Sequence, residues 1–177
     1  SEKTGLNRLH LHLTSETLAH QQATVDRVLE LGGRHIDVGQ LPDEEHVVLA
    51  DPEGNEFCVI EPGNNFLAGC GYLAEVACDG TREVGLFWHR ALGWPLVWDR
   101  GEETAIQSPA GGTKVSWGGP PVPPKTGRSR QRFQLSSDDP VTESRRLCAI
   151  GATLLGERED GLELADPDGN EFAIRPR

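Results

Sequence analysis

The first strongly patterned segment of the chain, residues 9–13, alternates strictly between leucine and histidine. This two-residue period predicts a half-buried strand whose leucines face the core and whose histidines, His10 and His12, face the other way. Apolar residues then recur at helical spacing over residues 18–29, and two glycines follow at 32–33. A glycine in the left-handed conformation commonly ends a helix, so the pattern predicts a strand followed by a helix.

Two later apolar runs, residues 47–49 and 57–60, flank a turn sequence. Residues 51–55 read Asp-Pro-Glu-Gly-Asn, in which proline presets the first turn dihedral and glycine tolerates a positive φ. The two runs therefore predict a hairpin, and residues 34–37 predict a short strand before it. The expected order is strand, helix and three strands.

This order is repeated in the sequence. The segment Asp-Pro-acidic-Gly-Asn-Glu-Phe occurs at residues 51–57 and again at 166–172, and Lys-Thr-Gly with a later arginine occurs at 3–8 and at 125–130. Similarity that keeps the same order over such distances indicates repeated modules rather than chance.

A third, diverged copy lies between these two. It has a predicted strand at 73–78, a helix at 84–92 and later strands at 104–106 and 114–117. We name the copies module A (5–62), module B (70–118) and module C (128–177). The sequence therefore predicts an α+β protein built from repeated βαβββ modules.

Composition narrows the classes of partner. The net charge is −11, which disfavours binding to the phosphate backbone of nucleic acids. There is no apolar run of about 18 residues that would predict a membrane span. The four cysteines are scattered singly and fit reduced thiols. We expect a soluble, cytoplasmic protein with no nucleic-acid or membrane partner.

Several segments together resemble a known family. Residues 87–94 read Phe-Trp-His-Arg-Ala-Leu-Gly-Trp, and with the two Lys-Thr-Gly entries and the two hairpins they resemble the vicinal oxygen chelate superfamily. This superfamily contains glyoxalases, bleomycin-resistance proteins and dioxygenases, and the resemblance is to its actinobacterial glyoxalase-like proteins. It covers nearly the whole chain. It implies that modules pair into a curled mixed sheet that forms a cup around a small ligand.

The resemblance also implies a domain organisation. A Lys-Thr-Gly linker typically joins the first module of a domain to its second, so residues 67–177 are expected to form a complete domain from modules B and C. By the same logic residues 1–66 are the second half of a domain whose first half is absent from this sequence. We expect this unpaired module to form a homodimer or to pair with a missing N-terminal module.

Alternation identifies the residues that would line the cup. We expect a small-molecule ligand to contact Glu75, Trp98, Trp117, Arg132, Gln134 and Arg175. The two arginines suit a carboxylate or phosphate, although a cross-strand pair with Glu163 or Glu171 is the alternative. Trp88 and Trp94 are expected to pack in the core.

Enzymes of the superfamily hold a divalent metal with His or Glu side chains from the first and last strands of paired modules. In modules B and C these positions carry Glu75, Arg132 or Gln134, and Ala173, which cannot form a metal site because a guanidinium does not ligate. In module A, His10, His12 and Cys58 occupy ligand-type positions.

A histidine and a cysteine alone supply too few ligands. We therefore expect no cofactor, and keep a divalent metal such as Zn, Fe, Ni or Mn at these module A positions as the alternative.

Three functions remain open. The first is a metal-free small-molecule binding protein of the bleomycin-resistance type, which we favour because the ligand positions of modules B and C are lost while the fold is kept. The second is a metal-dependent lyase, isomerase or dioxygenase, which the chain as encoded is not expected to be. The third is an assembly module whose cup packs against a partner. Fold resemblance does not decide between them.

Overall fold

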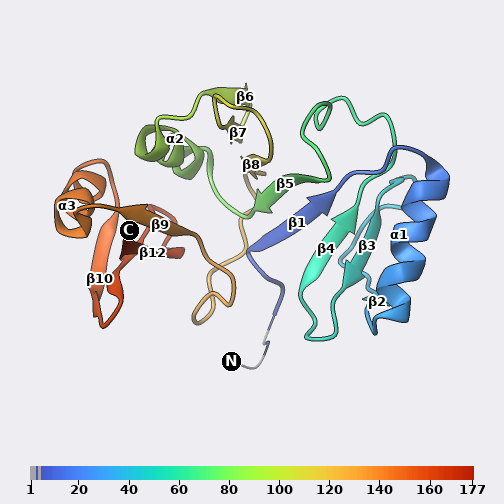
Figure 1. Ribbon diagram of the computed structural model, residues 1–177, viewed down its shortest axis with the longest axis horizontal. Helices are drawn as coiled ribbons and strands as arrows, with labels where there is room; N and C mark the ends of the chain where they lie inside the picture. The colour runs from blue at the N-terminus through green and yellow to red at the C-terminus, as the bar shows by residue number, and fades with distance from the viewer. Residues whose placement is uncertain (1–2, 4) are drawn as a thin grey trace. The chain divides into compact units, whose positions relative to one another are not determined.

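The computed structural model describes residue 3 and residues 5–177, so Thr4 of the first Lys-Thr-Gly segment lies outside the described residues. The chain divides into two compact units. The first contains residues up to Cys78 together with Gln107–Ser116, and the second contains Asp79–Ile106 together with Trp117–Arg177 (Figure 1). No described helix is both long and apolar enough to cross a membrane.

The first unit is built on module A. Its elements are β1 (Leu9–Leu13), α1 (Leu18–Glu30), β2 (Arg34–His35), β3 (Val47–Ala50) and β4 (Glu56–Val59), followed by β5 (Leu73–Cys78) and most of β8 (Lys114–Trp117). Strand β4 runs parallel to β1, while β3 is antiparallel to β4 and to β2. The predicted strand, helix and three strands of module A are confirmed.

Module A does not lack a neighbour at β1. Strand β5 of module B pairs antiparallel with it and places Val76 opposite Leu11 and Glu75 opposite His12. The expectation that this module is left without a partner in its own chain is therefore wrong at β1. Alternation shows which face a side chain occupies, but it does not show which strand lies beside it.

The Lys-Thr-Gly linkers suggested a domain boundary between residues 66 and 67. The compact units do not follow this boundary, because β5 and most of β8 belong to the same unit as module A. A homodimer through residues 1–66 stays a prediction. It can no longer be argued from an unpaired β1, because β5 pairs with that strand.

The second unit contains the rest of module B and all of module C. Its elements are α2 (Arg82–Leu92), β6 (Leu96–Arg100), most of β7 (Glu103–Gln107), β9 (Gln134–Ser137), α3 (Pro140–Ala149), β10 (Thr153–Arg158), β11 (Gly161–Ala165) and β12 (Glu171–Pro176). The last four strands form a sheet in the order β10-β11-β12-β9, in which only β12 and β9 are parallel. Module C thus repeats the strand order of module A. The α+β class with curled mixed sheets is confirmed (Figure 1).

In the first unit, α1 covers the leucine face of the sheet. Val25 of the helix packs with Leu49 and Val59, and Phe57 packs against this cluster while only partly buried. This agrees with the core-facing side predicted from the alternation of residues 9–13.

The core of the second unit is aromatic. Phe172 is 1% exposed, and its ring centroid lies 5.0 Å from that of Trp88 and 6.2 Å from that of Phe87. Trp88 also contacts Phe133 at 5.1 Å, and its indole Nε1 donates to Asp166 at 3.3 Å. Edge-on contacts of this kind suit aromatic quadrupoles, and the donated bond satisfies the polar end of the indole. Trp88 is a core residue, as expected.

The repeated sequence segments have the same structural role in both units. Lys3 forms an ion pair with Glu56, and Lys125 pairs with Glu171 at 2.8 Å, so the lysine of each Lys-Thr-Gly segment holds the glutamate of its hairpin. Backbone amides add to this contact, because Asn7 donates to Glu56 at 3.3 Å. Glu56 is only 7% exposed. A buried carboxylate needs such partners to offset its lost hydration.

We predict that Phe172→Ala lowers the free energy of unfolding by about 3–5 kcal/mol, since it removes a fully buried ring and leaves a cavity. Phe57→Ala should cost clearly less, because that ring is only partly buried. Urea unfolding followed by circular dichroism measures both. Equal costs would contradict the burial seen here.

Candidate functional site

A row of polar side chains crosses three strands of the first unit. In the sheet register, His12 of β1 stands beside Cys58 of β4 on one side and beside Glu75 of β5 on the other. His10 lies two residues earlier in β1 and therefore on the same face. The ligand atoms of His10, His12 and Cys58 all lie within 4.8 Å of one another.

Hydrogen bonds orient His12 within this row. Its Nδ1 lies 2.6 Å from a carboxylate oxygen of Glu75, and its Nε2 lies 3.0 Å from Nε2 of His10. The hydroxyl of Ser116, on β8, donates to the other oxygen of Glu75. Because Glu75 occupies Nδ1, the imidazole presents Nε2 toward His10.

The two histidines have opposite pKa shifts. Burial lowers the pKa of His12, but hydrogen bonds with Cys58 and Glu75 outweigh it and raise the pKa to about 9. Burial and the nearby charge of His12 lower the pKa of His10 to about 4. Burial alone would raise the pKa of Glu75, yet its hydrogen bond to His12 holds it below the usual value. At neutral pH the row therefore contains a neutral imidazole beside a charged pair.

The donor set of His10, His12 and Cys58 fits a metal ion of the zinc class, because imidazole nitrogen and thiolate sulfur are its preferred ligands. A tetrahedral ion with bonds of about 2.0–2.3 Å holds its ligand atoms about 3.3–3.8 Å apart, so small side-chain rotations would close the set. Glu75 would stand behind His12 as the carboxylate that commonly fixes a ligating imidazole.

An apolar shell surrounds the sulfur end of the row. Cys58 is buried in a cluster with Val48, Ile60, Leu67 and Cys70. Leu67 and Cys70 come from the connection between β4 and β5, which folds back over this face of the sheet. An apolar shell limits the access of water and strengthens electrostatic interactions inside it.

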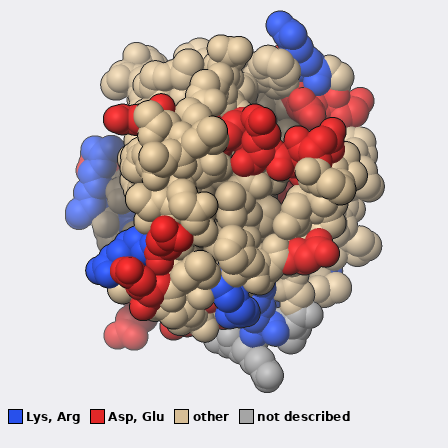
Figure 2. All heavy atoms as spheres, turned by 90° about the vertical axis from the view of Figure 1, so that its right-hand side faces the viewer, with Lys and Arg blue, Asp and Glu red and all other residues tan. Residues whose placement is uncertain are grey.

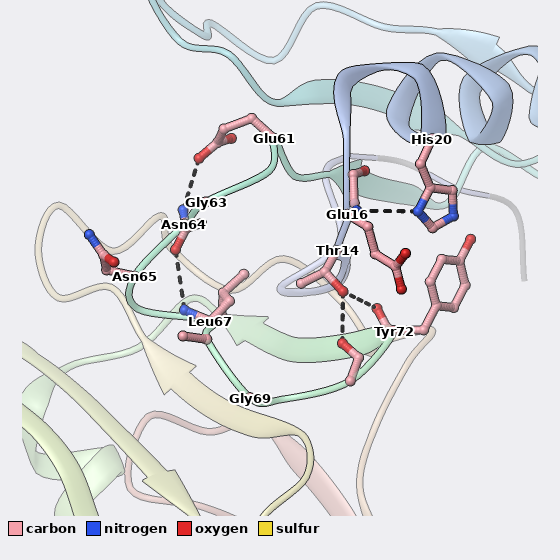
Figure 3. Close-up of a pocket in the computed structure, with 13 residues that line it drawn as sticks. Thr14, Glu16, His20, Glu61, Gly63, Asn64, Asn65, Leu67, Gly69 and Tyr72 are labelled. Atoms are coloured by element: carbon pink, nitrogen blue, oxygen red, sulfur yellow. Dashed lines mark hydrogen bonds between the residues drawn. The ribbon is translucent and has the colours of Figure 1, made fainter.

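A separate hollow of about 410 Å³ opens in the same unit. It is lined by residues 14–16 after β1, by His20 of α1 and by residues of the connection between β4 and β5. The His20 and Tyr72 rings lie side by side there (Figure 3). They stack with their centroids 6.3 Å apart. None of the 13 lining residues is a lysine or arginine, and none is a residue that the sequence predicted for a site.

The sequence-predicted ligand residues other than Glu75 lie in the second unit. Trp117 is 2% exposed, and its ring fills the space beside Gly80 and Gly85, so the expectation that it stacks on a ligand is wrong. Trp98 is half-buried on β6, with the Arg100 guanidinium 4.5 Å above its ring.

The polar residues among the predicted ligand contacts of the second unit belong to module C. Gln134 and Arg175 lie on its strands β9 and β12, and Arg132 lies two residues before β9. Gln134 is exposed on the edge strand β9. Arg132 donates to Glu163 at 2.6 Å, and Arg175 pairs with Asp160 at 3.0 Å. The cross-strand alternative is thus realised for Arg132, and Arg175 has a different partner from those expected.

The sequence analysis did not identify three residues that contact Glu75 or Glu163. Ser116 shares a strand face with Lys114, and the alternation of residues 114–117 was a signal that could have shown it. Arg128 precedes β9 and Arg158 ends β10, and both pair with Glu163. Only the three-dimensional structure brings these two arginines to one carboxylate.

Comparison with known proteins agrees with this architecture. A family model described as the glyoxalase-like domain matches residues 1–60 and 74–175. The chain belongs to the glyoxalase-like family. Its fold is that of the vicinal oxygen chelate superfamily, as the repeated segments suggested. A search of curated proteins finds no match to the sequence.

Solved structures of this glyoxalase-like fold resemble the chain at low identity. Glyoxalase I from Zea mays is 14% identical with a TM-score of 0.66, and the match covers 94% of this chain and 66% of that one. The chain thus spans just under two-thirds of the maize enzyme. TnmS3, an antibiotic binding protein from Streptomyces sp. CB03234, is 20% identical with a TM-score of 0.44 over 58% of this chain and 92% of that one. At 14% identity the likeness to the maize enzyme concerns the fold alone.

The molecular surface on the side of α1 carries charges of both signs. Figure 2 shows acidic and basic side chains interspersed there rather than a continuous basic surface.

We predict separate titrations of the two histidines in metal-free protein. By NMR, His10 should lose its proton at about pH 4 and His12 at about pH 9. The stability contributed by His12 is then fully present below its usual pKa of 6.5 and is lost as the pH rises through about 9. Glu75→Gln should lower the pKa of His12. Two coincident titrations near 6.5 would contradict this arrangement.

Proposed function

We propose that this glyoxalase-like chain binds a small molecule through a divalent metal ion held by His10, His12 and Cys58. The proposal rests on one observation, that their ligand atoms converge within 4.8 Å on one face of the sheet. From the sequence, these residues were expected at metal-ligand positions, but a histidine with a cysteine was judged to supply too few ligands for a metal ion. The structure brings all three together.

The residues have distinct roles in this proposal. His10 offers a neutral imidazole, and Cys58 offers a sulfur inside an apolar shell. Glu75 orients His12 through Nδ1, and Ser116 holds Glu75 in turn. Three protein ligands leave a coordination position for an oxygen of the small molecule, as in open zinc sites. When bound, an ion of this class acts as a Lewis acid toward that oxygen.

The fold does not decide whether the bound molecule is converted or only held, because the same fold serves both kinds of protein. We therefore propose binding and assign no reaction. The three proposed ligands all lie in the first unit. The module C sheet of the second unit is proposed to be metal-free, since Arg132, Gln134 and Ala173 occupy the positions where ligands would be needed.

A metal-free binding protein, the function favoured from the sequence, is the second candidate. One observation supports it: Glu75 already has His12 and Ser116 as partners, so the buried carboxylate is satisfied without an ion. In that case the row is a polar network that shapes the face of the sheet. Metal binding separates the two candidates.

We predict that metal-free protein takes up about one equivalent of Zn²⁺ or Co²⁺ per chain at neutral pH, measured by equilibrium dialysis and elemental analysis. With Co²⁺, a sulfur-to-metal charge-transfer band should appear, because Cys58 supplies a thiolate ligand. Cys58→Ser should abolish the band, and His12→Ala should reduce the affinity at least tenfold.

Two matched variants control this experiment. Cys148 is an exposed free cysteine and His35 is exposed on β2, so Cys148→Ser and His35→Ala should bind metal as the unaltered chain does. Loss of the band in Cys148→Ser, or undiminished metal binding in His12→Ala, would refute the site. If the chain takes up no metal at all, the metal-free candidate is favoured, and intrinsic tryptophan fluorescence then becomes the assay for ligands.

A further inference from the structure

The sheet of module C gathers arginines around a single buried glutamate. Glu163 of β11 is 4% exposed, yet three guanidinium groups reach its carboxylate. Arg132 donates to one oxygen at 2.6 Å, and Arg128 contacts the same oxygen. Arg158 donates to the other oxygen through Nε at 2.9 Å and through Nη2 at 2.6 Å.

A fourth arginine, Arg175, lies on the same face of the sheet, because it follows Ala173, the register partner of Glu163, by two residues in β12. Arg175 of β12 pairs with Asp160 through Nε at 3.0 Å, and its Nη1 is buried without a hydrogen-bond partner. A buried guanidinium nitrogen with no acceptor is costly in a folded protein. Such an orphaned donor points to an acceptor that the protein itself does not supply.

The charges of the cluster do not balance. In the ion pairs of these four arginines, four guanidinium groups share two carboxylates, Glu163 and Asp160, an excess of two positive charges in a chain whose overall charge is −11. One arginine would be enough to neutralise Glu163. The additional arginines repel one another unless an anion lies between them.

The strands leave room beside the carboxylate. Across the sheet, Glu163 has Gly156 on one side and Ala173 on the other, so neither neighbour has a side chain longer than a methyl group. The side chains of Arg128, Arg132 and Arg158 reach Glu163 and are 52%, 35% and 52% exposed. Their outward N–H groups are therefore within reach of a solute.

We propose that Arg128, Arg132, Arg158 and Arg175 form a binding site for a small oxyanion, the carboxylate or phosphoryl group of a small-molecule ligand. Guanidinium groups donate paired N–H bonds in a geometry that matches both of these groups. Glu163 acts as a positioning residue that holds three of the arginines in place. The site lies in the second unit and does not depend on the metal site proposed for the first.

Isothermal titration calorimetry with inorganic phosphate, in a non-phosphate buffer and against chloride at equal ionic strength, tests this site. The unaltered chain should bind about one equivalent of phosphate in preference to chloride. The double variant R132Q/R158Q should bind at least about tenfold more weakly, since it loses two charge-assisted donors. Arg145 is exposed on α3 of the same unit, so R145Q should bind as the unaltered chain does.

Glu163→Gln separates an anion site from a merely structural ion pair. Glutamine keeps an amide oxygen that can accept from the arginines and hold them in place, but it lacks the negative charge that competes with the ligand, so phosphate affinity should rise. A purely structural role predicts lower stability with no gain in affinity. Circular dichroism confirms that each variant is folded before the titration.

Parallel titrations with acetate and malonate distinguish the two sources of the oxyanion. Preference for malonate over phosphate would assign the site to carboxylate ligands, and the reverse would assign it to phosphoryl ligands. The proposal is overturned if phosphate, acetate and malonate all bind no better than chloride. It is also overturned if R132Q/R158Q and R145Q bind the anion equally well, or if Glu163→Gln weakens anion binding.

Discussion

The candidate metal site depends on the pairing of β1 with its two neighbours in the sheet, β4 and β5. The antiparallel pairing of β1 with β5 sets Glu75 opposite His12, while the parallel pairing of β1 with β4 sets Cys58 on the other side. Because side chains alternate strictly along strands, a shift of one residue in either pairing would turn these groups toward opposite faces. The row is thus a consequence of register, and β5 comes from a different module than β1 and β4.

Register is in turn held by the repeated segments. Lys3, which precedes β1, forms an ion pair with Glu56 at the start of β4. Lys125, which precedes β9, forms the corresponding ion pair with Glu171 at the start of β12. Each ion pair links the segment before the first strand of a module to the last strand of that module, and these two strands are far apart in sequence but adjacent in the sheet. The strongest repeats therefore recur because they carry a structural contact, and their recurrence does not by itself indicate a functional site.

The sequence predicted the elements and their faces well, because both follow from local periodicity. His10, His12 and Cys58 were placed on one face of module A, and Phe57 on the other, from alternation alone. Periodicity contains no information on which strands become neighbours, so the contact between Glu75 and His12 could not be foreseen. Trp117 was misassigned for a related reason: the glycines at 80 and 85 that make space for its ring lie far from it in sequence.

Glu75 and Glu163 show how similar buried carboxylates serve different chemistry through their partners. Glu75 is held by an imidazole, whose second nitrogen can offer a lone pair to a cation once it is deprotonated. Glu163 is held by guanidinium groups, which stay protonated and have no lone pair to offer, so their spare N–H groups select anions. The identity of the cationic partner, rather than the carboxylate, therefore decides which ligand each sheet can accept.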